Sequence, residues 1–530
     1  MSSNDITKKP DDRADDRPDL AVVTLDTGGP SVMAADEPTF ARTLAMIGGA
    51  FVIFGGMALG FNLAQGSARV STGWAVFALT LGLCFLLFHA AFDRDIQLRR
   101  LYMGFGLAVV VLGLILCVVP NPSGDLDYAD KIRSQFRWAS PCLVIGLLFL
   151  ISFLRNEDDP AIRNYSQLFL GGVGAVLAIA GLLGGFLKAE YFLPMGLLLG
   201  VLGLLYVTAF IASRGVSDDI GYYASLGLCG LGALVIVVAL GRSIFPAEGS
   251  RFFVQQGFLF FLAGLLAVAL GGGLSLDWPL FVLTRRELSS FFLSPIAYLT
   301  LLGFAVISWV QYYNFINMLY ESSASPPRVA PMTEPIVVSY FVAIFPVLTT
   351  VFTPSVLTMR LLSEEQRSGT MEVLLTAPVD ETVVVFSKFL AGLISFLVVW
   401  LPFGLYLVTI PLAGGTPFDY RPLLSFFITL VATGAAFISI GLFFSSITKN
   451  QIASGVLTFA AMLVLTLVYW VIDFSNDETV KKVLTHMSYI HLWIETLQGK
   501  ILFQYLLFFP SLAAVMLFST IKILESRKWR

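Results

Sequence analysis

A succession of long apolar runs, each about as long as a bilayer is thick, dominates this sequence of 530 residues. The first run opens near residue 43 and the last ends near residue 521, with short polar turns between them. A helix needs about 20 apolar residues to cross the hydrocarbon core, and helices satisfy their own backbone hydrogen bonds there. The sequence therefore predicts an all-α polytopic membrane protein.

The composition agrees with a membrane protein and argues against nucleic-acid-binding and metal sites. Hydrophobic residues make up 57% of the chain and charged residues 13%, about half the charged fraction of a soluble domain. The net charge of −3 offers no basic surface, so we expect no nucleic-acid partner. Cys84, Cys117, Cys142 and Cys229 all lie in apolar runs, and no two of the three histidines have metal-ligand spacing. We therefore expect packed cysteines and no metal site.

We predict about fourteen transmembrane helices. Residues 277–293 are excluded because Arg285, Arg286 and Glu287 lie at their centre, and an arginine at mid-bilayer costs about 3 kcal/mol or more. That segment is expected to form an interfacial helix. The predicted spans are 43–65, 73–92, 101–120, 138–154, 167–187, 191–212, 221–240, 252–276, 294–318, 335–359, 389–413, 422–448, 452–472 and 501–521.

The distribution of lysine and arginine predicts that both termini are cytoplasmic. Fourteen of the 33 lysines and arginines fall in seven short segments that this topology places inside: 93–100, 155–164, 213–219, 284–290, 360–370, 448–451 and 525–530. The segment 121–137 is the exception, because it carries Lys131, Arg133 and Arg137 on the predicted outer side. We expect an integral, multi-pass protein of the bacterial cytoplasmic (inner) membrane.

The chain divides into three predicted regions. Residues 1–40 are acidic, lack a secretory signal and are predicted to be a disordered cytoplasmic tail. Residues 41–276 hold eight spans, with three loosely similar stretches centred on charged cytoplasmic turns; these form either an internal repeat or merely similar hairpins. Residues 277–530 hold six spans, and their external segment 473–500 is predicted to form one or two short helices on the outer surface.

Several chemistries lack their sequence signals. No G-x-x-x-x-G-K-[ST] motif occurs, so we expect no ATP site in the chain. The spans contain almost no carboxylates, which disfavours an ion-coupled carrier, and they bring together no nucleophile and base. We therefore expect a protein that is not an enzyme, with no catalytic residues and no cofactor of its own.

The stretch "LLSEEQRSGTMEVLLTAPV", residues 361–379, is an unusually charged element between two apolar runs. Ser363 and Gln366 have the spacing of a capping box, and Gly369 suits the left-handed residue that ends a helix. Thr370 is predicted to cap a second turn that Pro378 ends. Glu364, Glu365, Arg367 and Glu372 are expected to face outward or to pair with one another. The alternative is an ordinary loop that needs charge to stay in water.

Three stretches resemble ABC-2 (export-type) ABC transporter permeases. "SEEQRSGTMEVLLTAPV" is similar to the charged cytoplasmic segment of that family. Residues 285–316, "RRELSSFFLSPIAYLTLLGFAVISWVQYYNFI", resemble the first helix and span of its gliding-motility branch, and "LESRKWR" at 524–530 resembles the usual ending of that branch. The resemblance covers about 277–530 and leaves 41–276 unassigned.

The resemblance implies a permease without its own ATPase. Two six-span units would form the path, with ATP and magnesium on separate cytoplasmic ATPase subunits. By this analogy Glu364, Glu365, Arg367, Gly369, Thr370 and Glu372 would couple the chain to the ATPase, and Arg285, Arg286 and Glu287 would lie on the interfacial helix beside them. The implied partners are that ATPase, a second permease copy or homologue in a dimer, membrane lipid and an extracytoplasmic auxiliary subunit.

Two functions remain open from the sequence. The first is the permease subunit of an ATP-driven exporter, which couples ATP hydrolysis to translocation or to mechanical work across the membrane. The second is a membrane scaffold that anchors a peripheral complex and transports nothing. They differ in whether an ATPase depends on the segment 361–379.

Overall fold

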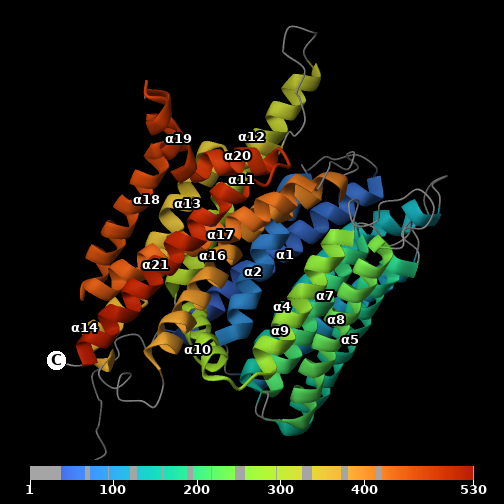
Figure 1. Cartoon of the computed structure of the whole chain (residues 1–530). Coiled ribbons are helices and arrows are strands. Elements are labelled where there is room, and N and C mark those ends of the chain that lie inside the picture. The colour runs from blue at the N-terminus through green and yellow to red at the C-terminus, as the bar shows by residue number, and fades with distance from the viewer. Residues whose placement is uncertain are drawn as a thin grey trace, which may run out of the picture. The chain divides into compact units, whose positions relative to one another are not determined.

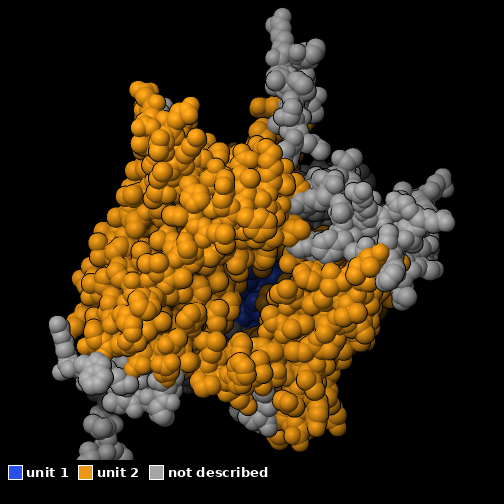
Figure 2. Space-filling model, in the orientation of Figure 1, with its two compact units in different colours: residues 1–103 blue, residues 104–530 orange. Residues whose placement is uncertain are grey.

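The computed structural model is helical throughout the residues that it describes (Figure 1). These are 37–65, 72–92, 95–119, 128–157, 159–187, 195–215, 218–244, 257–293, 295–324, 337–371, 380–412, 421–474 and 476–528. The predicted tail, apart from its last four residues, lies outside them. The chain forms two compact units, residues 1–103 and 104–530 (Figure 2). The all-α prediction is confirmed for the described residues.

The helices before residue 277 are long and apolar. The first unit contains α1 (Glu37–Gln65), α2 (Thr72–Phe92) and the start of α3 (Ile96–Val118). The second unit continues with α4 (Tyr128–Asn156), α5 (Pro160–Leu187), α7 (Met195–Arg214), α8 (Asp219–Ile244) and α9 (Phe258–Ser275). Within it, α7 packs against α4, α5, α8 and α9, and the Tyr206 hydroxyl donates to the Leu143 carbonyl at 2.7 Å.

Glycines form the contacts between successive antiparallel helices of this region. A Cβ on Gly203 of α7 would lie 2.1 Å from the Ala178 amide nitrogen of α5, so the two backbones touch. Glycines bring α1 close to α2, α3 to α4, and α8 to α9 in the same way. The helices of each pair are consecutive in the sequence, and the topology predicted from the sequence places the residues between them outside. The possible internal repeat in the sequence was centred on the predicted cytoplasmic turns. The close glycine contacts instead pair the helices that are connected on the predicted outer side.

Substituting Gly203 by alanine is expected to destabilise the front region by about 1–3 kcal/mol, because the added methyl group must push α5 and α7 apart. The thermal unfolding midpoint in detergent would report the loss. Gly172 of α5 is the matched control, since a Cβ there meets no atom within 4 Å. Equal midpoints for the Gly203→Ala and Gly172→Ala variants would show that the close contact contributes nothing.

The helices after residue 277 surround α17 (Arg421–Ile447), which packs against α13, α16, α18, α20 and α21. Their order is α10 (Pro279–Leu293), α11 (Pro295–Ala324), α12 (Val337–Phe341), α13 (Ile344–Thr358), α14 (Ser363–Ser368), α16 (Glu381–Leu412), α17, α18 (Gln451–Phe474), α19 (Glu478–Met487), α20 (Tyr489–Leu497) and α21 (Phe503–Lys528). Gly441 of α17 admits Thr358 of α13, whose hydroxyl would lie 2.1 Å from a Cβ there. One aromatic-rich core joins these helices.

The structure supports fewer spans than the fourteen predicted. Among the described residues, eleven helices are long and apolar enough to cross a membrane, or twelve if the bent pair α9–α10 is one span. Helices occur in all fourteen predicted segments. Helix α11 carries Gln311, Asn314 and Asn317 and is not among the eleven. The expected single span 335–359 is divided into α12 and α13, because Ala343 is extended.

Helix α10 turns sharply away from α9. The two helices are bent by 100°, and Leu276 between them has an extended backbone. Pro279 at the first position of α10 favours this break, because a proline disfavours helical conformation in the residue before it. The predicted change of direction at 277–293 is therefore present, and it places Arg285, Arg286 and Glu287 on a separate helix.

Candidate functional site

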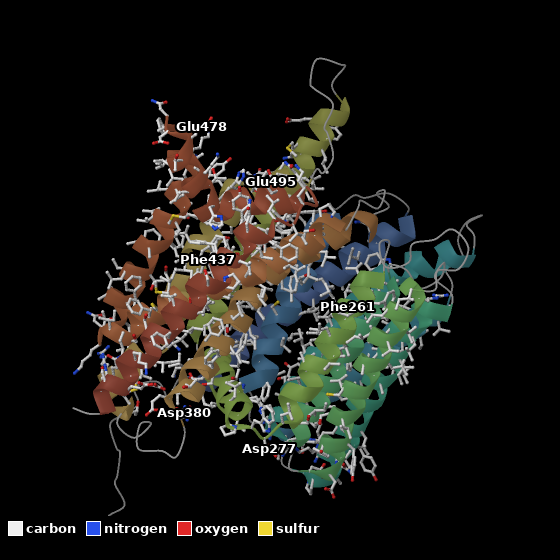
Figure 3. The ribbon with its side chains drawn as sticks, viewed as in Figure 1. Phe261, Asp277, Asp380, Phe437, Glu478 and Glu495 are labelled. Carbon is white, nitrogen blue, oxygen red and sulfur yellow. The ribbon has the colours of Figure 1, made fainter. Side chains whose placement is uncertain are left out.

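The sequence-predicted charged residues gather at one end of the C-terminal helices. Helices α10 and α14, the beginning of α16 and the final turns of α17 and α21 meet there (lower part of Figure 1; Asp380 marks this end in Figure 3). Segments from five parts of the chain therefore build one polar cluster beneath an apolar bundle.

Lys388 of α16 is the centre of this cluster. Its side chain is 2% exposed, and its Nζ lies 2.7 Å from Glu365 Oε1 and 3.1 Å from Glu287 Oε1. Arg286 approaches the same Glu287 oxygen at 3.3 Å. A buried ammonium group is tolerated only where carboxylates compensate its charge. Lys388 therefore joins α10 and α14 to the start of a transmembrane helix.

The backbone of α14 is fastened to α17 at its first residues. The Ser445 hydroxyl oxygen accepts hydrogen bonds from the amides of Leu362 and Ser363, each at 3.0 Å. These amides belong to the first turn of a short helix, where no intrahelical acceptor exists. The Ser445 side chain of α17 therefore takes the place of an N-cap side chain for α14.

Gln366 and Arg527 attach to the last turn of α17. Gln366 Nε2 donates to the Ser446 carbonyl at 2.8 Å, and Arg527 of α21 donates to the same oxygen at 2.7 Å. The last carbonyls of a helix lack intrahelical donors and carry partial negative charge. The end of α17 is thus shared between α14 and the C-terminal turn of α21.

The other predicted residues of α14 face away from the bundle. Glu364 is exposed and lies 3.6 Å from Arg360, and Arg367 is exposed in the last turn. Gly369 ends the helix with φ 75°, as predicted for a left-handed residue. Thr370 is exposed, with its hydroxyl 2.8 Å from that of Ser368. Glu372 lies outside the described residues.

Two details of the sequence-based interpretation are wrong. Ser363 and Gln366 form no capping box: the Ser363 hydroxyl donates to the Met359 carbonyl, and Gln366 reaches α17. Glu365 neither faces outward nor pairs within its own segment, because Lys388 draws it inward. The sequence analysis also missed Lys388, Ser445 and Ser446. Lys388 stands alone as the basic residue between Arg367 and Arg421, which was a usable signal.

Arg285 holds the bend between α9 and α10. Its Nη1 and Nη2 donate to the carbonyls of Leu274 and Leu276, both at 2.8 Å. Asp277 Oδ1 lies 3.9 Å from Arg285 Nη2, and the Phe281 carbonyl accepts a hydrogen bond from Arg285 Nε at 3.4 Å. Of the three residues predicted on α10, Glu287 faces the cluster, Arg286 is exposed beside it, and Arg285 satisfies the end of α9.

The external segment 473–500 differs from its prediction in one respect. It forms two short helices as expected, and α19 has no buried residue: its first six residues are exposed and its last four are half-buried. Helix α20 is instead buried: Trp493 is fully enclosed, and its ring lies 5.4 Å from that of Trp400 and 5.2 Å from that of Phe426. Burial of Tyr489 raises the pKa of its hydroxyl. This helix is part of the core at the end opposite to α14 (Glu495 in Figure 3).

Comparison with known proteins identifies the region that holds the cluster. Residues 259–507 match the model of the ABC-2 family transporter protein family, a little under half of the chain. No curated protein and no solved structure matches the chain. Membrane subunits of this family carry no ATPase domain, and ATP binds to a separate ATPase with which they generally pair. Residues 259–507 of this integral, multi-pass chain are therefore similar to an ABC-2 family transporter membrane domain, the domain of an ABC transporter's membrane subunit.

Proposed function

We propose that the chain is the permease subunit of an exporter and that α14 with its flanking turns couples it to a cytoplasmic ATPase. The observation that carries this proposal is the position of Lys388, which ties α14 and α10 to α16 through Glu365 and Glu287. A rigid displacement of α14 by an ATPase would pass directly to a spanning helix through these contacts.

The two faces of α14 divide the work. Glu365 and Gln366 bind the bundle, whereas Glu364 and Arg367 are exposed on the other side. Exposed charges at a docking surface set register and partner choice. In this proposal Glu364 and Arg367 contact the ATPase, together with Thr370 and Glu372, and Gly369 provides the turn between them. Arg286 lies beside this surface on α10.

The topology and the partners belong to the same proposal. We place the C-terminus in the cytoplasm, since segments 284–290, 360–370 and 525–528 lie at the same end of the C-terminal helices, and we place the N-terminus there from the distribution of lysine and arginine. The predicted regions 41–276 and 277–530, and membership of the gliding-motility branch, also remain proposals. A second permease copy would complete the path, and α19 would be the external contact for an auxiliary subunit.

The test is a charge reversal that spares the contacts of α14 with Lys388 and α17 and alters only its exposed face, including the pair between Glu364 and Arg360. The tagged chain is purified in mild detergent, its partners are identified by mass spectrometry, and ATP hydrolysis is measured. Exchanging the exposed charges by Glu364→Lys with Arg367→Glu is expected to reduce the bound ATPase by about tenfold or more, because docking charges are reversed. Glu365 is left unchanged, since altering it would also break the contact with Lys388.

The matched control reverses charges at the opposite end of the molecule. Glu478 and Lys482 are exposed and lie four residues apart on α19, and the Glu478→Lys, Lys482→Glu variant should retain the ATPase. Equal loss in both variants would contradict docking at α14. A preparation without any ATPase, even after crosslinking, would favour the alternative of a membrane scaffold that transports nothing.

A further inference from the structure

The last turn of α21 makes contacts that membrane insertion does not require. Leu524 is fully buried there, and Arg527 Nη2 lies 2.7 Å from the Ser446 carbonyl oxygen at the end of α17. The stretch 524–530 was distinctive in the sequence, yet the coupling surface on α14 does not include it. The carbonyl that Arg527 binds is the one that Gln366 of α14 also uses.

The shared carbonyl explains why an arginine suits this position. A carbonyl oxygen has two lone pairs, so Ser446 can accept from Arg527 and Gln366 at the same time. The charge of Arg527 also complements the negative end of the α17 dipole. One residue earlier, Ser445 accepts from two amides of α14. Two adjacent residues of α17 thus carry α14, and Arg527 fixes the turn to which both belong.

We propose that Arg527 is a positioning residue for α14: it holds the final turn of α17 in the geometry that the first turn and Gln366 of α14 require. When Arg527 is removed, α14 stays folded onto Lys388 at Glu365 but loses its defined attachment at Ser445 and Ser446. That this loosening weakens coupling rests on the proposed function. The positioning itself does not.

Hydrogen–deuterium exchange on the full-length chain in detergent tests the proposal. The Arg527→Gln variant removes the charge-assisted hydrogen bond and is expected to speed amide exchange at 360–371 and 443–448 about tenfold or more. Lys522→Gln is the matched control, because the described partners of Lys522, Glu525 and Phe518, belong to its own helix. Gln366→Leu removes the second donor to Ser446 and should speed exchange in the same two segments.

Exchange at 360–371 that is unchanged in Arg527→Gln overturns the proposal, as does a rise spread equally over α5, α7 and α19, which would mean general destabilisation. If Arg527→Gln yields no folded protein, the milder Arg527→Lys variant, which keeps the charge but loses the planar donor group, decides the question by whether exchange at 360–371 rises.

The ATPase readout is kept separate so that the two proposals fail independently. ATP hydrolysis by the co-purified ATPase is measured on the same Arg527→Gln sample. Faster exchange at 360–371 with unchanged hydrolysis supports positioning by Arg527 and contradicts coupling through α14. Unchanged exchange contradicts the role of Arg527 whatever the ATPase does.

Discussion

Replacing Lys388 by methionine is expected to lower the free energy of unfolding by about 3–5 kcal/mol, because it removes the buried cation that Glu365 and Glu287 share and leaves Glu287 beside the exposed Arg286. Glu287 and Glu365 are only 14% and 19% exposed and lie on different helices, so water cannot fully replace the ammonium group. The same variant should abolish stimulation of the bound ATPase, since α10 and α14 lose their common attachment to α16. Unfolding in mixed micelles of increasing denaturing detergent measures the first effect, and ATP hydrolysis measures the second.

A variant in which the whole cluster is neutral tests whether the loss of stability comes from uncompensated buried charge. In the triple variant Lys388→Met, Glu287→Gln, Glu365→Gln no buried charge is left uncompensated, so most of the stability should return. Stimulation of the ATPase should stay low, because the ionic attachment of α10 and α14 is still missing. If Lys388→Met alone unfolds at the same denaturant concentration as the native chain, the buried ion pairs contribute nothing and the central place given to Lys388 is wrong.

Replacing Trp493 by alanine is expected to destabilise the C-terminal core by about 3–5 kcal/mol, the usual cost of removing a large enclosed aromatic side chain. Trp493 is fully buried in α20 and makes edge contacts with the rings of Trp400, Phe426 and Tyr489. The resulting cavity should release α20 before the spanning helices unfold. Amide exchange at 489–497, followed with increasing temperature, would detect this local opening.

The control for Trp493 is an aromatic residue of the same region that touches little. Phe474, at the end of α18, is 85% exposed, so Phe474→Ala should change the unfolding midpoint only slightly. Indistinguishable midpoints for the two alanine variants would mean that α20 rests on the surface, as the sequence alone had suggested.

The sequence was sufficient for the helices because the bilayer imposes a length on each apolar run. Residues 422–448 and 452–472 were predicted as spans, and α17 and α18 cover Arg421–Ile447 and Gln451–Phe474. It was insufficient where a helix is short or polar. Helix α20 has nine residues, too few for periodicity to decide whether its apolar face lies on the core or on the surface.

The candidate site was located by its charges but not resolved in detail. Helix α14 has six residues, so sequence spacing could not decide which of the adjacent residues Glu364 and Glu365 faces inward. Lys388 was assigned to a loop because the predicted span began at 389, whereas α16 begins at Glu381 and buries Lys388 in its second turn. Its partners come from segments about 100 and 23 residues away, and only tertiary packing brings such residues together.

The sharp bend before α10 has a consequence for how the chain could be divided experimentally. Helix α9 packs glycine against glycine with α8 at Gly232 and Gly264, yet the family match already begins at residue 259. Through Arg285 it is also tied to α10. A deletion ending at residue 276 would therefore remove part of the transporter domain. A deletion ending before residue 257 would keep that domain whole, but it would expose to lipid the glycine face of α9 that α8 had covered. Helix α9 therefore packs with the helices on both sides of it, and neither deletion leaves all of these contacts intact.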